Sequence, residues 1–194
     1  MKIHVDASKQ DTKLPQILDA AVRLFVERGI DGTSVKEIAS AAKVAEGALY
    51  RHFKSKEALA WHLFETNLKE YTSTLLAKVL AVRDARERIR VLVEESLGAC
   101  ERNPTLFYYL ILSEHRELQR FTADYLHPGN IVDQLVSEGQ ASGELRKGEP
   151  ELLSSLILGS AHRLCIRRCR GQLKVPLTDL AGELAESIWR SVKA

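Results

Sequence analysis

Apolar residues recur with helical spacing along nearly the whole chain. The first such segment has its apolar residues on one face of a helix, at Ile17, Ala21, Leu24 and Phe25. Asp11 or Thr12 is placed to cap the start of this helix, and Gly29 is placed to end it. No run of alternating apolar and polar residues indicates a strand or a hairpin. The pattern therefore predicts an all-α protein.

Short helices follow the first one. Ser34 and Glu37 have the spacing of a capping box, in which each side chain satisfies the other residue's backbone N–H. A tight turn at Lys43 leads to another short helix through 47–52, and Ser55 is placed to cap a long helix. We therefore expect a compact three-helix unit at the start of the chain.

Beyond residue 60 the predicted helices are longer, and Pro or Gly marks their ends. These breaks are Asn103-Pro104, His127-Pro128, Ser142-Gly143, Gly148-Glu149-Pro150, Gly171 and Val175-Pro176. The pattern divides the chain into a flexible tail over 1–10, a three-helix domain over 11–60 and a larger helical domain over 61–194.

Composition limits the class of protein. The 194 residues include three Cys, too few for a disulfide framework, so a reducing interior is expected. No secretory signal is evident and no apolar stretch approaches the roughly 20 residues that span a bilayer, so we expect a cytoplasmic protein without membrane contact. The formal net charge is only +2, but residues 1–60 hold ten Lys and Arg against eight Asp and Glu, while 61–194 hold eighteen of each. The surplus of positive charge lies in residues 1–60, the region that contains the three-helix domain.

That domain has a pattern suited to binding DNA. Two short helices joined by a tight turn can place the second helix in a major groove. Gly47 and Ala48 would let this helix approach base edges closely, and Tyr50, Arg51 and His52 project from its end. Hydroxyl and ammonium groups are spaced to touch flanking phosphates, at Thr33, Ser34, Lys36, Lys54 and Lys56.

This stretch resembles the tetracycline-repressor (TetR) family of bacterial transcriptional regulators over about 14–60. The resemblance rests on Gly32-Thr33-Ser34, Gly47-Ala48-Leu49-Tyr50-Arg51-His52-Phe53 and Lys54-Ser55-Lys56-Glu57-Ala58-Leu59. It implies a helix-turn-helix motif over about 34–53. It also implies phosphate contacts for Thr33, Ser34, Tyr50, His52 and Lys56, and base-facing positions for Lys36, Glu46, Gly47, Ala48 and Tyr50. Lys43, Arg51 and Lys54 complete the expected DNA-binding set. Alternatively, Tyr50 packs on Ile38 and His52 satisfies a core carbonyl.

Three residues depart from the family's pattern. Lys43 stands where a left-handed backbone usually selects Gly or Asn. Ala45 replaces a Ser cap worth about 1 kcal/mol. Glu46 stands where a basic residue is common, and its carboxylate could accept from a cytosine amino group instead.

The resemblance also implies that the larger domain binds a small-molecule effector and dimerises through its last two helices. We expect the interface at Leu153, Ile157, Ser160, Leu164, Leu184, Ile188 and Val192, with the small residues Gly159 and Ala161 allowing close approach. The alternative is that these faces bury within one subunit. For the effector pocket we expect Trp61, Phe64, Phe107, Tyr108, Phe121 and Tyr125, with Tyr109, His115 and His127 nearby, although ordinary core packing would also explain them.

Two cysteines and several arginines share one predicted helix. Cys165 and Cys169 lie four residues apart among Arg163, Arg167, Arg168 and Arg170. Because cations lower a thiol pKa, a redox- or metal-sensing role is conceivable, but Cys-x3-Cys is a weak metal motif and inert buried thiols are the better explanation. We expect no metal site and no cofactor. The arginines have their own ordinary explanation, as cations that complement a helix C-terminus.

Other classes of protein fit less well. The sequence has no Gly-rich phosphate loop, no His-Glu-x-x-His and no nucleophile elbow, so we do not expect an enzyme. An all-α carrier of hydrophobic molecules would account for the aromatic residues but not for Lys36, Tyr50 and Lys54. The sequence therefore predicts a homodimeric transcriptional repressor that a small molecule releases from a palindromic site on double-stranded DNA.

Overall fold

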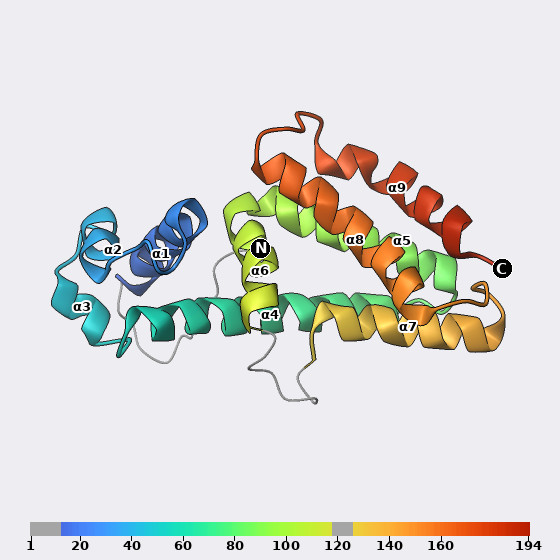
Figure 1. The fold of residues 1–194 in the computed structure, drawn as a ribbon, viewed down its shortest axis with the longest axis horizontal. Helices are drawn as coiled ribbons and strands as arrows, with labels where there is room; N and C mark the ends of the chain where they lie inside the picture. Colours follow the sequence, from blue (N-terminus) through green and yellow to red (C-terminus); the bar gives the residue numbers. More distant parts are fainter. Residues whose placement is uncertain (1–12, 118–125) are drawn as a thin grey trace.

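The computed structural model describes residues 13–117 and 126–194, and helices account for most of this part of the chain (Figure 1). The elements are α1 (Leu14–Arg28), α2 (Val35–Ala41), α3 (Glu46–Tyr50), α4 (Lys56–Leu80), α5 (Ala85–Arg102), α6 (Pro104–Glu117), α7 (Pro128–Ser142), α8 (Pro150–Cys169) and α9 (Leu177–Val192). Within the described ranges the only β pairing is an isolated bridge between Leu145 and Lys193. The all-α prediction is confirmed.

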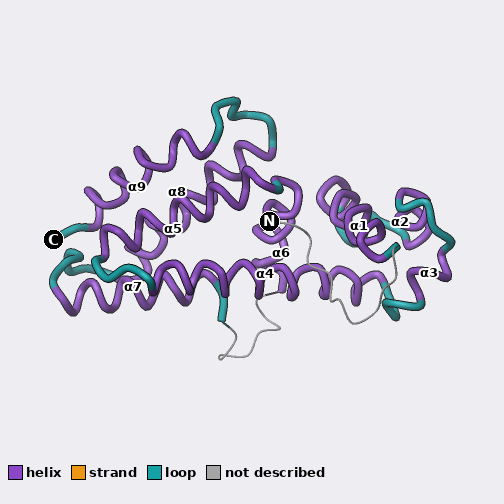
Figure 2. Tube along the Cα trace, turned by 180° about the vertical axis from the view of Figure 1, so that it is seen from behind, coloured by secondary structure: helices purple, strands orange, loops and turns teal. Residues whose placement is uncertain are grey.

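The long helix α4 runs through the molecule and organises the other helices. Figure 1 shows α1, α2 and α3 gathered at one end of α4, with α5, α8 and α9 stacked over its other part and α7 alongside. The view from behind shows the same arrangement (Figure 2). In the parts of the chain that the structure describes, no helix is long and apolar enough to cross a membrane.

Helix ends in the first part of the chain follow the sequence signals closely. The Ser34 hydroxyl accepts from the Glu37 N–H at 3.2 Å and the Glu37 carboxylate accepts from the Ser34 N–H at 2.8 Å, which confirms the capping box. Ser55 caps α4 by accepting from the Ala58 N–H at 3.1 Å. The prediction for the start of α1 is wrong, since its N-cap is Lys13, without a side-chain hydrogen bond. Asp11 and Thr12 lie outside the described residues, as does the predicted tail over 1–10.

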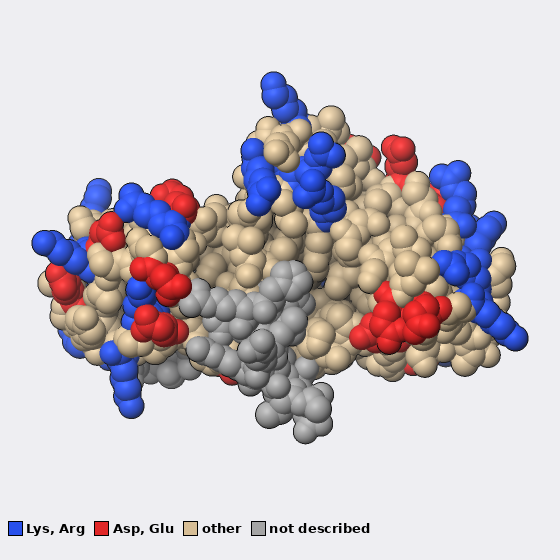
Figure 3. All heavy atoms as spheres, viewed as in Figure 1, with Lys and Arg blue, Asp and Glu red and all other residues tan. Residues whose placement is uncertain are grey.

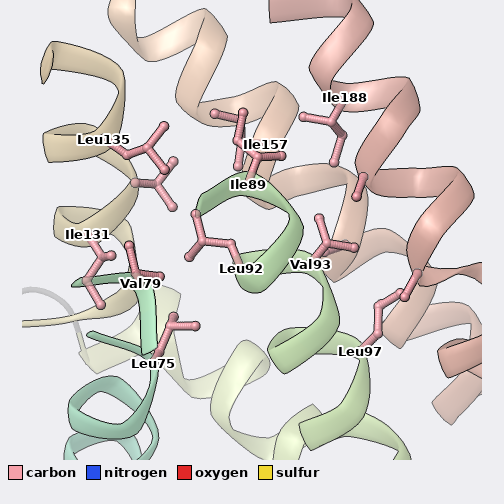
Figure 4. Close-up of a cluster of buried hydrophobic side chains, with 14 of the residues drawn as sticks. Leu75, Val79, Ile89, Leu92, Val93, Leu97, Ile131, Leu135, Ile157 and Ile188 are labelled. Atoms are coloured by element: carbon pink, nitrogen blue, oxygen red, sulfur yellow. The ribbon is translucent and has the colours of Figure 1, made fainter. Parts of the chain in front are cut away.

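The helices bury two separate hydrophobic clusters. One lies among α1, α2, α3 and the first half of α4, and it also includes Leu106, Tyr109 and Leu110 of α6. The other joins the second half of α4 to α5, α7, α8 and α9 (Figure 4), and Phe107 and Ile111 of α6 belong to it. Helix α6 therefore contributes one side to each cluster and, like α4, connects the two parts of the molecule.

Candidate nucleic-acid interface

The turn between α2 and α3 has the tight geometry that the sequence predicts. Lys43 has a φ of 56°, in the left-handed region that Gly or Asn usually occupies. The Val44 N–H donates to the Ala39 carbonyl at 3.0 Å, which closes the turn. Ala45 is the N-cap of α3 and makes no side-chain cap, as expected from its methyl group.

Helix α3 presents three residues outward and turns two inward. Glu46 and Gly47 are exposed, and a Cβ added to Gly47 would have no neighbour within 4 Å. The Tyr50 side chain is 57% exposed, which argues against the alternative that it packs on the core. The base-facing expectation for Ala48 is wrong, because Ala48 is 6% exposed and packs with Leu49 in the first cluster.

The residues expected at phosphates occupy the region where α2 and α4 begin. Thr33 is the exception: its side chain is buried, and its hydroxyl donates to the carbonyls of Gly29 at 2.8 Å and Leu24 at 3.3 Å. Thr33 therefore holds the α1–α2 connection, and its hydroxyl does not face a phosphate. At Gly32 beside it, an added Cβ would lie 2.4 Å from the Arg28 carbonyl oxygen, so the backbone leaves no room for a side chain there.

Ser34 and Lys56 line one shallow hollow of about 390 Å³. The Lys56 ammonium donates to the Asp31 carbonyl at 3.4 Å, which places its charge at the edge of this hollow. Glu37 also lines it, and the pKa of its carboxyl lies below the ordinary value because the Ser34 hydroxyl and N–H bond to it and Arg28 is close. Glu37 therefore stays charged as the partner of Ser34 in the capping box. Attraction of a phosphate would have to come from the positive groups around it.

The remaining basic residues lie on α2, in the turn before α3 and just after α3. Lys36, Lys43, Arg51 and Lys54 are exposed. His52 is half-buried, with its ring centroid 6.2 Å from that of Phe53. In Figure 3, Lys and Arg at this end of the molecule are interspersed with Asp and Glu, in keeping with the small charge surplus of residues 1–60. DNA contact by each of these residues stays a prediction.

The predicted pocket residues that the structure describes do not all lie in the same hydrophobic cluster. Phe64 is fully buried in the first cluster, 6.0 Å from Trp61 between ring centroids. Phe107 is buried in the second cluster, where its ring meets Tyr71 edge-on at 5.5 Å. Tyr108 is half-buried, and its hydroxyl accepts from Arg170 at 3.1 Å. Phe64 and Phe107 are buried in different clusters, and a role for them in a pocket stays a prediction. Phe121, Tyr125 and the side chain of His115 lie outside the described residues.

A small hollow lies instead between α4 and α5. It has a volume of about 140 Å³ and is lined by Glu70, Tyr71, Thr74, Leu75, Glu95, Ala99 and Arg102. Ligand pockets are typically about 300–1,000 Å³, so this hollow would have to widen to hold a ligand of ordinary size. It was missed in the sequence because its residues come from two helices and share no pattern.

The predicted dimer interface is wrong at four positions. Leu153, Ile157, Ile188 and Val192 are all 4% exposed or less and lie in the second cluster of their own subunit. They face inward because they form an apolar stripe on each of the two helices, and α5 packs against both helices. Ser160, Leu164 and Leu184 are half-buried, so a role for them in an interface stays a prediction.

The three cysteines gather between α5 and α8. Cys100 and Cys165 are fully buried, and the Cys100 and Cys169 sulfurs lie 3.8 Å apart. Hydrogen bonding to Cys165 and burial raise the pKa of Cys100, and hydrogen bonding to Cys100 and burial raise that of Cys169. Because the thiolate is the reactive form, these raised pKa values favour inert thiols over a sensor. No group of three or more metal-ligating side chains occurs among the described residues.

Comparison with known proteins agrees with the geometry of the α2–α3 unit. The model for the tetR family of bacterial regulatory proteins matches residues 17–63. A fatty acid metabolism regulator protein of Bacillus subtilis (strain 168) is 27% identical over 182 residues, which cover 90% of this chain and 92% of that protein. The transcriptional regulator AcrR of Shigella flexneri is 38% identical over 110 residues, which cover 47% of this chain and 51% of that protein.

Solved structures share the whole fold. The fatty acid degradation regulator FadR from Bacillus halodurans aligns with a TM-score of 0.75 at 23% identity and covers 94% of this chain and 97% of that one. The regulator FadR from Bacillus subtilis, solved in complex with stearoyl-CoA, aligns with a TM-score of 0.70 at 23% identity and covers 89% of this chain and 96% of that one. These relatives are transcriptional regulators rather than enzymes. Residues 17–63 therefore match the tetR family of bacterial regulatory proteins, and the chain as a whole is similar to transcriptional regulators.

Proposed function

We propose that the protein is a repressor that binds a palindromic operator as a homodimer and is released by a fatty acyl-CoA thioester. The observation that carries the DNA-binding part is the outward face of α3. Gly47 leaves the helix backbone open to approach, and Tyr50 extends beside it with 57% of its side chain exposed. A helix with a bare N-terminal end can enter a major groove and read base edges.

A homodimer is supported by the outer face of α8. Leu152 is 50% exposed, Leu156 is half-buried and Gly159 is open to solvent, and all three lie opposite the buried stripe of the helix. Figure 3 shows that the middle of this face is largely free of Lys, Arg, Asp and Glu. A helix that is apolar all round needs a partner on each side. In a two-fold symmetric dimer the α3 surface would occur twice. To bind half-sites one turn of DNA apart, the two α3 helices would have to lie about 34–36 Å from each other.

The effector class is supported by the relatives rather than by a cavity. The fatty acid metabolism regulator of Bacillus subtilis aligns along 90% of this chain, and a FadR structure holds stearoyl-CoA. The hollow between α4 and α5 is smaller than such a ligand requires. Ligand entry would therefore separate α4 from α5 or from its other neighbours.

Movement of α4 provides the mechanism of release. Its first half packs with α1–α3 and its second half packs with α5 and α7, so a shift at one end is transmitted to the other. The dimer has one conformation in which the spacing of the two α3 helices fits DNA and another in which it does not. The effector releases DNA only if it binds the second conformation more tightly than the first.

The experiment has two stages. The operator is first selected from genomic fragments with the purified protein, and a labelled duplex then reports binding by fluorescence anisotropy. We expect stearoyl-CoA to weaken operator binding at least tenfold, while CoA or stearate at equal concentration has a much smaller effect. If stearoyl-CoA binds the protein but leaves operator affinity unchanged, the proposed release mechanism is wrong.

A further inference from the structure

The C-terminal end of α8 carries a row of exposed cations, which we call the α8 arginine row: Arg163, Arg167 and Arg170, with Lys174 in the loop that follows. All four are exposed. The three arginines are spaced i, i+4 and i+7, so they lie on one face of the helix, over about 10 Å of its axis. In Figure 3, Lys and Arg gather at the top of the molecule, where Figure 1 places the turn from α8 into α9.

No carboxylate in the described part of the chain forms an ion pair with this row. The acidic residue close to it, Glu101, already accepts from Arg168 at 2.6 Å and from the Leu177 N–H at 3.1 Å. Like charges four residues apart on a helix destabilise it. The repulsion between these cations is therefore not offset by an ion pair within the described part of the subunit.

The helix dipole explains only part of this row. Cations are favourable near a helix C-terminus, but the effect falls off within the last turn. Arg167 and Arg168 occupy that turn. Arg163 lies a further turn back and Lys174 lies beyond the helix, so neither is accounted for in this way.

Hydrogen bonds fix the loop after the helix and one member of the row, Arg170. Arg168 donates to the carbonyls of Leu173 at 3.2 Å and Lys174 at 3.1 Å, which ties the loop back to the helix. The Arg170 Nε donates to the Tyr108 hydroxyl at 3.1 Å and leaves its two terminal nitrogens free to bind. Guanidinium groups match phosphate geometry and can bind its oxygens in pairs.

We propose that the α8 arginine row binds the phosphate groups of a small molecule, with room for a diphosphate or two separate phosphates along the helix. Two sources share this chemistry, namely a CoA moiety and a nucleotide. If the phosphates belong to CoA, the inference rests on the proposed function and gives the effector's polar end a docking site on α8. Binding of the phosphate compound can be measured without DNA, so the two proposals can fail separately.

The test compares three probes by isothermal titration calorimetry: CoA, adenosine 3′,5′-bisphosphate and ATP. The variant R163Q/R167Q/R170Q removes the three arginines of the row, and K69Q/R83Q/K147Q removes three exposed cations elsewhere. We expect at least one probe to bind the wild type and to lose at least tenfold in affinity in the row variant, with a change below twofold in the control. Thermal melting checks that both variants fold.

The outcomes separate the possibilities. Tightest binding of CoA and the bisphosphate assigns the site to a CoA moiety, and tightest binding of ATP assigns it to a nucleotide. Absence of binding by all three probes, or equal binding by wild type and row variant, overturns the proposal. A row variant that changes only the monomer–dimer equilibrium would mean that the arginines serve a partner subunit, which also overturns it. If CoA binds through the row but stearoyl-CoA does not release DNA, this site stands and the release mechanism fails.

Discussion

The two parts of the molecule that α4 connects differ in how surface position relates to function. In the α1–α3 unit, local geometry decides which residues face outward: the short helix α3 has one buried side, and Gly47 and Tyr50 lie on the other. In the α5–α9 body, a helix such as α8 is apolar on opposite sides, with Leu153 buried and its neighbour Leu152 half exposed. An apolar stripe therefore identifies the core in the first part but leaves core and interface ambiguous in the second.

Truncating one large aromatic residue in each part tests whether there are two separate cores. Phe64 and Phe107 are buried in different clusters. We expect Phe64→Ala and Phe107→Ala each to lower the free energy of unfolding by about 3–5 kcal/mol, since each removes a packed ring and leaves a cavity. Urea denaturation at fixed protein concentration measures the change. A loss below about 1 kcal/mol for either would indicate that the residue lines an open pocket after all.

Adjacent leucines on α8 test the two sides of that helix. Leu153→Ala should lower the free energy of unfolding by about 2–5 kcal/mol, because Leu153 is fully buried in its own subunit. Leu152→Ala should leave the stability of the monomer nearly unchanged but weaken the dimer, because half of Leu152 is exposed. Sedimentation velocity over a dilution series separates the two effects, which denaturation alone would mix in a dimer. Unchanged association in Leu152→Ala would remove this face from the interface.

Two substitutions on α3 should change DNA binding without harming the fold. Tyr50→Ala is expected to cost about 1–3 kcal/mol of operator affinity, the usual range for a lost base contact. Gly47→Ala should stabilise the helix by up to about 1 kcal/mol, since the added Cβ meets nothing, and yet weaken operator binding by filling the space that the DNA needs. Anisotropy with the selected operator and thermal melting measure both. Gly182→Ala, on an equally open part of α9, is the matched control.

The difference between local geometry and distant packing also explains which predictions from the sequence were correct. The Ser34–Glu37 capping box was predicted correctly because it needs only a three-residue spacing along the chain. Thr33 was predicted incorrectly because its hydroxyl donates to the carbonyls of Leu24 and Gly29, and the Leu24 contact depends on how the chain turns at the end of α1. The inward face of α8 depends on α5, far away in the chain, so no local pattern could tell Leu152 from Leu153.

The smallest expected effect is at Tyr109 of α6, whose side chain contacts α1 and α4. Its hydroxyl donates to the Ala60 carbonyl of α4 at 2.8 Å, and its ring stacks on Phe25 of α1 at 6.1 Å. Tyr109→Phe keeps the ring and removes the hydrogen bond, so it should lower the free energy of unfolding by only about 1 kcal/mol. If α6 and α4 together transmit effector binding to α3, the same variant should also reduce the change in operator affinity that stearoyl-CoA causes. A variant that loses stability but keeps the full effector response would assign transmission to α4 without help from α6.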